Sequence, residues 1–499
     1  MAQQLPILLV VAPLMAAFLV PIVGWWNKRL CYPLAVAALA APLVCTLGIL
    51  KQVMAGGGFS YHLGGWSPPW GIEYALDYLN SFVLVIISIV SFIVTIYSKE
   101  SVRSELPDKI TPFYTLLLLM VTGLLGMTVS GDAFNVFVFL EISSLSCYGL
   151  IAIGSDGAPF ATFRYIIMGT IGASFYLLGV GYLYLVTGTL NMADLARLLP
   201  QLYASRVVLT AGIFLLVGIG IKMALFPLHA WLPGAYTYAP STVSAMVAPL
   251  YTKVAAYLLI RIMFTVFQPA FFIEVIPATT LLSWLAAIAM LVGSIYAIAQ
   301  SDLKRMLSYS VVAQIGYIAL GIGLANRLGL SGALLHILNE AFTKGCVFLV
   351  AGAIVFKLKS CRLENFNNLY RKMPFTMSAF TIGTFSMIGI PPTSGFFSKL
   401  YLLLGSVAAG NWIFVAVLLV STLLNVVYFF RVIQLASFEK PMPDYARITP
   451  YETVAMDEVP LSMQIPIQLM AAGILLSGIF SSRILSAVIV HIIPKSFTP

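Results

Sequence analysis

The chain has 499 residues, of which 60% are hydrophobic and only 9% are charged, and its mean hydropathy is +0.98. Soluble domains carry about 25% charged residues, so this composition excludes an ordinary soluble protein and indicates a polytopic all-α membrane protein. The net charge of +9 is spread over short loops and is therefore no sign of nucleic-acid binding. The five cysteines and four histidines show no metal-ligand spacing, which argues against a redox centre.

At about 20 residues per crossing, the apolar stretches predict fourteen membrane helices. In chain order they are expected at 5–26, 30–53, 76–98, 112–130, 132–153, 161–187, 207–230, 240–265, 275–299, 304–325, 329–357, 374–408, 411–437 and 463–490. The first stretch is too long for the apolar region of a signal peptide and lacks a basic segment before it, so we expect a retained span. Residues 56–71 are rich in glycine, proline and aromatic residues, which predicts an extended loop or hairpin at the membrane interface.

Lysine and arginine are distributed unevenly over the predicted loops. Most of those outside the membrane follow odd-numbered helices. The positive-inside rule therefore predicts that these loops are cytoplasmic and that both termini face outward. The stretch 438–460 is expected to be a solvated cytoplasmic linker, with a docking surface as the alternative. Its acidic residues are Glu439, Asp444, Glu452, Asp457 and Glu458.

Three predicted helices contain residues that interrupt a helix: the seventh at Pro227, the eighth at Pro249 and the twelfth at 389–392. Interrupted helices at corresponding places in two halves of a transporter are typical of inverted repeats. We therefore predict two five-helix repeats, helices 4–8 and 9–13. The resulting regions are 1–110 (helices 1–3), 111–270 (first repeat), 271–437 (second repeat) and 438–499 (linker and last helix).

Lys222 lies in the apolar part of the seventh helix, shortly before Pro227. A lysine at bilayer depth costs about 2.5–3.5 kcal/mol on insertion scales, which favours a hydrated polar pocket over a lipid-facing position. Glu141, near the middle of the fifth helix, is the expected partner. At about 4 Å and an effective dielectric constant near 20, their attraction is about 4 kcal/mol. The alternative is a static buried ion pair that only fixes packing.

The eleventh helix is the densest polar stretch within the predicted spans. His336, Glu340 and Lys344 follow at intervals of four residues, which predicts that they share one face of the helix and can pass protons. The alternative is a Glu340–Lys344 salt bridge that braces the bundle. Lys253 in the eighth helix is expected to face the interior, although it could instead reach toward the interface near Arg261.

Lys399 follows the Pro-Pro interruption of the twelfth helix. Together with Lys222, Lys253, His336 and Lys344, it forms a row of protonatable groups through the membrane interior. Such a row predicts lateral proton conduction. His229, beside the seventh-helix interruption, is either an entry relay or an interfacial hydrogen-bond donor. Asp77 and Asp132 fit structural roles at helix N-termini, where negative charge is favoured.

Six motifs in order make the chain resemble the antiporter-like subunits shared by respiratory complex I, Mrp-type Na+/H+ antiporters and membrane-bound hydrogenases. They are FLEISSLSCYGL, GIKMALFPLHAWLPGAY, APSTVSAMVAPLYTKVAAYLLIR, SDLKRMLSYSVVAQIGYI, LLHILNEAFTKGCVFLVAG and GIPPTSGFFSKLYLL. The resemblance is strong over residues 110–435 and favours the D-type subunit of Mrp antiporters or its hydrogenase and complex I counterparts. It implies fourteen helices with helices 7 and 12 broken, two inverted repeats, and ion translocation along a central hydrophilic axis.

The resemblance also implies roles for single residues. Glu141 is similar to the glutamate that pairs with the seventh-helix lysine, here Lys222, and Lys253 to the bridging lysine of the eighth helix. The axis residues matched in the second half are His336, Lys344 and Lys399. Two positions depart from the family pattern: Glu340 stands where many relatives have histidine, and one branch has glutamate where this chain has Lys399.

The sequence thus predicts a proton-translocating subunit of a multisubunit complex in the cytoplasmic membrane of a prokaryote, with exchange of Na+ for H+ as an open alternative. It is expected to hold no cofactor or metal, and its partners are other membrane subunits of an Mrp-type, complex I-like or membrane hydrogenase assembly, together with lipid. Any redox chemistry would belong to the larger translocase. The other readings are a self-sufficient secondary transporter of a small solute and a scaffold with inert ion pairs.

Overall fold

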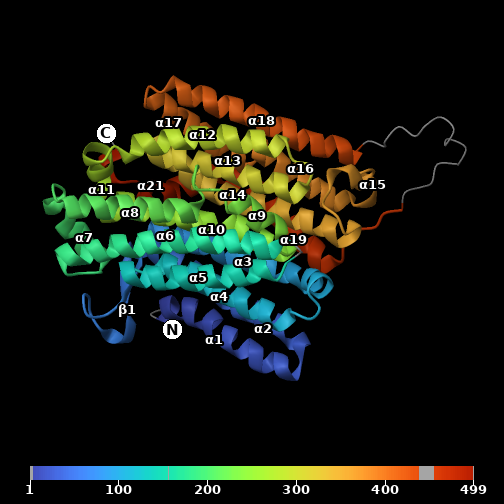
Figure 1. The fold of residues 1–499 in the computed structure, drawn as a ribbon, viewed down its shortest axis with the longest axis horizontal. Coiled ribbons are helices and arrows are strands. Elements are labelled where there is room, and N and C mark those ends of the chain that lie inside the picture. The colour runs from blue at the N-terminus through green and yellow to red at the C-terminus, as the bar shows by residue number, and fades with distance from the viewer. Residues whose placement is uncertain (1–3, 155–156, 438–454, 498–499) are drawn as a thin grey trace, which may run out of the picture.

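The computed structural model describes residues 4–154, 157–437 and 455–497, which form a bundle of roughly parallel long helices (Figure 1). The long helices are α1 (Leu5–Trp26), α2 (Cys31–Gly56), α3 (Tyr78–Glu105), α4 (Ile110–Val129), α5 (Ala133–Ala152), α6 (Ala158–Thr187), α8 (Arg206–Met223), α10 (Ser241–Arg261), α12 (Ala278–Ile298), α13 (Leu303–Gly323), α14 (Arg327–Leu358), α16 (Pro374–Ile388), α17 (Ser394–Ala408), α18 (Trp412–Ser437) and α19 (Leu461–Ile479). The short ones are α7 (Met192–Leu198), α9 (Leu232–Tyr238), α11 (Gln268–Ala270), α15 (Leu369–Lys372), α20 (Ser481–Ile484) and α21 (Val490–Ile492).

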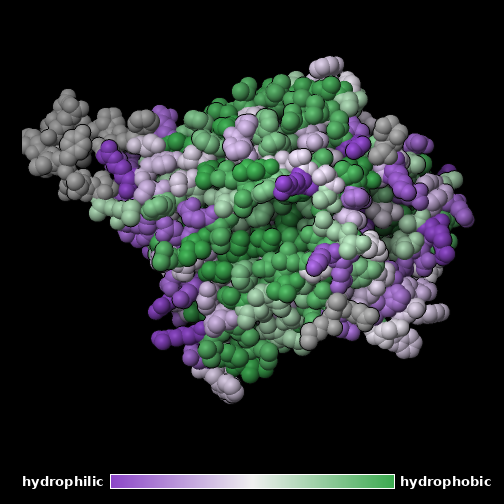
Figure 2. Space-filling view, turned by 180° about the vertical axis from the view of Figure 1, so that it is seen from behind, coloured by the Kyte–Doolittle hydropathy of each residue, from purple (hydrophilic) through white to green (hydrophobic). Residues whose placement is uncertain are grey.

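The described residues contain thirteen helices that are long and apolar enough to cross a membrane. Figure 2 shows a broad hydrophobic band between two ends that are richer in hydrophilic residues. The prediction of a polytopic all-α membrane protein is therefore confirmed. The acidic residues Glu439, Asp444 and Glu452 of the predicted linker lie outside the described residues.

Burial differs strongly between helices and identifies the centre of the bundle. In the most apolar stretch of each helix, only 39% of the residues are buried in α1 and 33% in α2. In α10 every residue of this stretch is buried, and in α13 94% are. Outer helices keep one apolar face toward the lipid, while helices that are covered on all sides can carry polar groups away from it. Helix α10 therefore forms the centre around which the charged groups are arranged.

Helix α8 ends at Met223, and the chain turns at Ala224, whose φ is 57°, before α9 begins at Leu232. Helix α16 ends at Ile388, and Gly389, with φ 92°, leads into the turn before α17. Interruptions are thus present at two of the three places where the sequence predicts them, near Pro227 and at 389–392.

The predicted interruption at Pro249 is wrong, because α10 continues through this residue. Proline removes one backbone donor and crowds the preceding turn. In α10, neighbouring helices surround the site completely, and their packing holds the helix together despite the missing hydrogen bond.

A small antiparallel hairpin precedes α3, as predicted, although it extends further along the chain. It pairs β1 (Phe59–His62) with β2 (Glu73–Leu76), with Phe59 opposite Leu76. Figure 1 shows that both chain ends lie toward the same end of the bundle as this hairpin. In agreement, the Tyr61 hydroxyl donates a hydrogen bond to Gln4 Oε1 at 2.8 Å.

Candidate functional site: a buried row of charged and polar side chains

Lys222 lies in the last turn of α8, with 3% of its surface exposed. Its ammonium group lies 3.9 Å from Glu141 Oε1 on α5 and donates a hydrogen bond to Ser144 Oγ at 2.8 Å. The predicted Glu141–Lys222 pair is therefore present, and the amine points into the protein and not into lipid. Trp231, at the N-terminus of α9, stabilises the interruption between α8 and α9, because its Nε1 donates a hydrogen bond to the Ile221 carbonyl at 3.0 Å.

Ser144 connects Lys222 to the central helix. Its hydroxyl donates to the Leu140 carbonyl at 2.7 Å, so its single hydrogen is already used. The Tyr251 hydroxyl of α10, 2.8 Å away, must therefore donate to Ser144. Lys222 and Tyr251 thus share one acceptor oxygen, which links α8, α5 and α10.

Lys253 lies on α10 with 1% of its surface exposed, so it faces the interior and does not reach toward Arg261. Its ammonium group donates to the Ala248 carbonyl at 2.9 Å and lies 3.8 Å from Glu340 Oε2 of α14, which is fully buried. Glu340 therefore forms its ion pair with Lys253 and not with Lys344, one turn along its own helix. The Glu340–Lys344 bridge suggested by the sequence is wrong, because a tertiary partner faces the carboxylate more closely than its helical neighbour does.

Lys344 and His336 lie one turn of α14 to either side of Glu340, and both are fully buried. The Lys344 ammonium group donates to Ser310 Oγ of α13 at 2.5 Å. His336 is held from two sides: Nε2 lies 2.9 Å from Gln314 Oε1, and Nδ1 lies 2.9 Å from Ser398 Oγ.

The histidine site can hold either protonation state without movement of heavy atoms. Because Gln314 Oε1 can only accept, His336 Nε2 carries a hydrogen. Ser398 Oγ lies 2.9 Å from Nδ1 and 3.1 Å from the Gly395 carbonyl. Its hydrogen can point to Nδ1 when the ring is neutral, or to Gly395 when a protonated Nδ1 donates to Ser398.

Lys399 occupies the end of the row, beside the second interruption. Its ammonium group donates to the carbonyls of Met387 (2.7 Å) and Ile388 (3.2 Å), the last residues of α16. A cation at a helix C-terminus satisfies unpaired carbonyls and compensates the negative end of the helix dipole. It also lies 4.9 Å from the centre of the Tyr317 ring, which stacks on His336.

The row divides into two clusters on opposite faces of α10. Tyr251 faces Ser144 and Lys222, whereas Lys253, two residues later, faces Glu340. Residues two apart on an α-helix point about 200° away from each other, so α10 itself separates the clusters. Between them lies Thr252, whose buried hydroxyl has no hydrogen-bond partner among the described residues.

A family model described as NADH:quinone oxidoreductase/Mrp antiporter, transmembrane, matches residues 130–425. The chain belongs to this family. A chain named as the N subunit of NADH-quinone oxidoreductase from Desulforudis audaxviator is 46% identical over 99% of both chains. A chain named as the D-type subunit of a Na(+)/H(+) antiporter from Bacillus subtilis is 31% identical over 84% of this chain and 83% of its own length.

Solved structures of the family share the fold. A chain of the membrane-bound sulfane sulfur reductase, an archaeal respiratory membrane complex, superimposes with a TM-score of 0.90 and 31% identity, covering 99% of this chain and 98% of its own. The family resemblance drawn from the six motifs is thereby confirmed.

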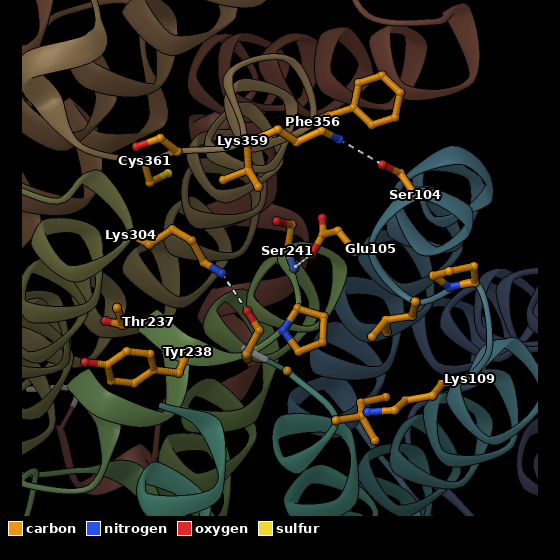
Figure 3. A pocket seen from close by; sticks show the side chains of 18 of the residues that line it. Ser104, Glu105, Lys109, Thr237, Tyr238, Ser241, Lys304, Phe356, Lys359 and Cys361 are labelled. Carbon is orange, nitrogen blue, oxygen red and sulfur yellow. Dashed lines mark hydrogen bonds between the residues drawn. The ribbon is translucent and has the colours of Figure 1, made fainter. Parts of the chain in front are cut away.

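A cavity of about 640 Å³ opens at the end of the bundle where α3 and α14 end and α10 and α13 begin (Figure 3). Lys304 donates to the Ala239 carbonyl at 2.6 Å, and Glu105 accepts from the Ser241 amide at 2.9 Å, at the start of α10. Its charged lining is balanced: Glu105, Asp108 and Asp302 face Lys109, Lys304 and Lys359. Burial raises the pKa of the Cys361 thiol to about 12, so this residue adds no charge. Because the opposite charges balance, the cavity is better suited to admit water and ions of either sign than to bind a ligand with one kind of charge.

The remaining predicted positions lie outside the row. Asp77 and Asp132 cap α3 and α5, accepting from the amides of Asn80 (3.0 Å) and Asn135 (2.7 Å), which confirms their structural reading. His229 lies partly exposed between α8 and α9 and stacks on Phe226, with ring centres 5.3 Å apart. Its functional role stays a prediction.

The sequence interpretation missed three neutral partners of the lysines and of the histidine: Ser144, Ser310 and Gln314. A signal for some of them is present in the sequence. Ser144 follows Glu141 by three residues and Gln314 follows Ser310 by four, spacings that place polar side chains on one face of a helix.

Proposed function

We propose that this chain is the ion-translocating subunit of a multisubunit membrane complex and that it moves protons along the buried row. The proposed path residues are Glu141, Lys222, Lys253, His336, Lys344 and Lys399, with His229 and Glu340 in accessory roles. The related chains are named as subunits of a quinone oxidoreductase and of a Na(+)/H(+) antiporter. Electron transfer, where such a complex performs it, is assigned to other subunits.

The observation that carries the subunit assignment is the position of Glu141. Its side chain is 30% exposed, and it shares a face of α5 with the exposed apolar residues Val138 and Leu145. A charged group on a lipid-facing surface is costly, so this face is best explained by another protein subunit that covers it. Glu141 would then couple Lys222 to the neighbouring subunit, because a change in one charge alters the pairing of the other.

The chemistry of the row favours protons over sodium. Sodium needs several oxygen ligands, whereas the row consists mainly of amines, which donate hydrogen bonds and repel a cation. Four lysines and His336 face only two carboxylates, Glu141 and Glu340, so the buried groups cannot all be charged without a large cost. A set of this kind exchanges protons more readily than it binds a metal cation.

Buried polar atoms that lack a hydrogen bond within the described residues support a hydrated path along the row. Both carboxylate oxygens of Glu340, Gln314 Nε2 and Asn339 Nδ2 are buried and have no hydrogen-bond partner in the described part of the protein. Buried polar atoms are nearly always hydrogen-bonded, and internal water commonly supplies the partner. We propose that ordered water at these atoms connects Glu340 to the amines on either side.

Two matching sets of backbone contacts support the proposed inverted repeats. In the first set, the Ala133 amide donates to the Leu190 carbonyl and the Met192 amide donates to the Gly131 carbonyl. In the second set, the Leu303 amide donates to the Cys361 carbonyl and the Leu363 amide donates to the Ser301 carbonyl. All four hydrogen bonds are 2.9 Å long. The first set lies next to α7 and the second shortly before α15, and Figure 1 places α7 and α15 at opposite ends of the bundle. This is the relation expected for repeats of opposite orientation.

The finer architecture is proposed accordingly: fourteen transmembrane helices, with repeats formed by helices 4–8 (residues 111–270) and 9–13 (271–437). Residues 1–110 precede the repeats and 438–499 follow them. The positive-inside rule places both termini outside and the cavity of Figure 3 on the cytoplasmic side, where it would admit protons toward Lys344 past Lys304 and Ser310.

Reconstitution of the assembled complex in proteoliposomes tests the proposal. We expect Lys222→Ala and Glu141→Ala to abolish proton translocation while the complex still assembles, and Lys51→Ala, at an exposed position on α2, to leave it unchanged. Translocation at the wild-type rate in both axis variants would refute the proposal. Solute transport by the isolated chain would support the stand-alone transporter instead.

A further inference from the structure

A second cavity, of about 550 Å³, lies between the α1–α2 connection, the beginnings of α2 and α4 and the end of α3. Four cationic side chains line it, Lys28, Arg29, Lys99 and Arg103, against the single carboxylate of Glu100. This excess of positive charge distinguishes it from the balanced cavity of Figure 3.

The four cations are available for a ligand. Within the described residues, none of them lies in ion-pair contact with a carboxylate. The Lys99 ammonium group lies 5.9 Å from the centre of the Tyr32 ring, which holds it over the cavity wall. The positive-inside rule explains basic residues on this side of the membrane, but it does not require them to converge on one cavity.

The backbone adds to the positive field. Ile110, the first residue of α4, lines the cavity, and within the described part of the chain the N-cap of this 20-residue helix, Lys109, makes no side-chain capping bond. The N-terminus of a helix presents free amide groups and the positive end of the dipole, and both favour a bound anion.

The surroundings are those of a membrane interface. Trp25 and Trp26, at the end of α1, are 86% and 80% exposed, and exposed tryptophans typically lie at the level of lipid headgroups. The outward faces of α1 and α2 are apolar and largely uncovered, so acyl chains can lie against them below the cavity. Basic pockets between membrane helices are suited to anionic headgroups.

We propose that this cavity binds a phosphate group, supplied by the headgroup of an anionic phospholipid. The four cations would contact the phosphate oxygens, Tyr32 and Tyr114 would line the site, and α1 and α2 would carry the acyl chains. The site is independent of the proton path, since none of its lining residues belongs to the buried row.

Native mass spectrometry of the full-length chain tests the proposal, with phosphatidylglycerol or phosphatidylcholine added at equal concentration. We expect a preference for phosphatidylglycerol that falls about five-fold per charge removed, and thus about 25-fold in the double variant Lys99→Gln/Arg103→Gln. The matched control is Arg305→Gln/Lys372→Gln, which removes two exposed charges outside the cavity. Lys28→Gln/Arg29→Gln, in the exposed α1–α2 connection, serves as the second test variant if the first does not fold.

Competition with inorganic phosphate distinguishes the source of the phosphate group. Retention of phosphatidylglycerol in millimolar phosphate supports the lipid assignment. Displacement at that concentration, combined with loss of phosphate binding in Lys99→Gln/Arg103→Gln, would overturn it in favour of free phosphate. Equal lipid preference in the wild type, the cavity variants and the control would show that the cavity binds neither.

Discussion

Lys253 of α10 and Glu340 of α14 lie 3.8 Å apart, both essentially without solvent exposure, and their contact joins the two proposed repeats. Removing one member of a buried ion pair leaves the other charge without compensation, which typically costs about 3–5 kcal/mol. We expect Glu340→Gln to destabilise the protein by about 3 kcal/mol and to reduce proton translocation at least ten-fold. Thermal unfolding and proteoliposome assays measure the two effects, with the exposed Glu364→Gln as the control.

Replacing both members of this pair separates stability from function. In Lys253→Met/Glu340→Leu no buried charge is left unpaired, so stability should return toward that of the wild type. Translocation should remain lost, because the connection between the two halves is absent. A double variant that translocates normally would show that the pair is only a structural brace.

Ser144 offers a milder test of the first cluster. Ser144→Ala removes the acceptor shared by Lys222 and Tyr251 but leaves the Glu141–Lys222 pair in place. We expect a loss of about 1–3 kcal/mol in stability and a several-fold slower translocation. Ser146→Ala is the matched control, since among the described residues the Ser146 hydroxyl bonds only to the Ile142 carbonyl of its own helix. Equal rates in the two variants would argue against a role of the shared acceptor.

Lys399 distinguishes a structural cation from a proton-exchanging one. Lys399→Arg keeps a donor near the Met387 and Ile388 carbonyls, but guanidinium does not release its proton in proteins. The variant should therefore unfold close to the wild-type temperature and yet translocate protons at least ten-fold more slowly. Full activity in the arginine variant would mean that Lys399 only caps α16.

The Asp77–Arg261 pair, outside the row, should affect stability but not transport. Arg261 donates to both carboxylate oxygens of Asp77, at 2.5 and 2.8 Å. Partial burial acts to raise the pKa of Asp77, but the Arg261 guanidinium outweighs it and holds this pKa below its ordinary value. The stabilisation is therefore complete above the unfolded-state pKa, about 3.9, and is lost as pH falls through the lower folded-state pKa.

The variant Asp77→Asn tests this predicted dependence of stability on pH. The variant should be less stable than the wild type at neutral pH, and the difference in unfolding temperature should shrink as pH falls below about 4. Translocation at neutral pH should be unchanged. A constant difference across this range would show that the carboxylate charge does not contribute.

The sequence was sufficient for groups whose position is dictated by the membrane. Glu141 and Lys222 could be paired in advance because each is expensive at bilayer depth without a partner, and because the family resemblance pairs the same two positions. The interruptions near Pro227 and at Gly389 followed from backbone chemistry. These features depend on local sequence and on the lipid, both of which are known beforehand.

Contacts between distant helices could not be derived in the same way. Helical spacing suggested Lys344 for Glu340, but the carboxylate pairs with Lys253 because α10 packs against α14 at this level. Pro249 suggested an interruption, but the burial of α10 on all sides keeps the helix continuous. In both cases the outcome depends on which helices are neighbours, and one sequence does not contain that information.

The placement of Tyr251 and Lys253 on opposite faces of one helix has a mechanical consequence. Proline at position 249 leaves α10 short of one backbone hydrogen bond, just before these two side chains. Any bend of α10 at this point would displace both side chains together, so the Tyr251–Ser144 and Lys253–Glu340 contacts would change in the same step. The two charge clusters are therefore linked through the backbone of one helix.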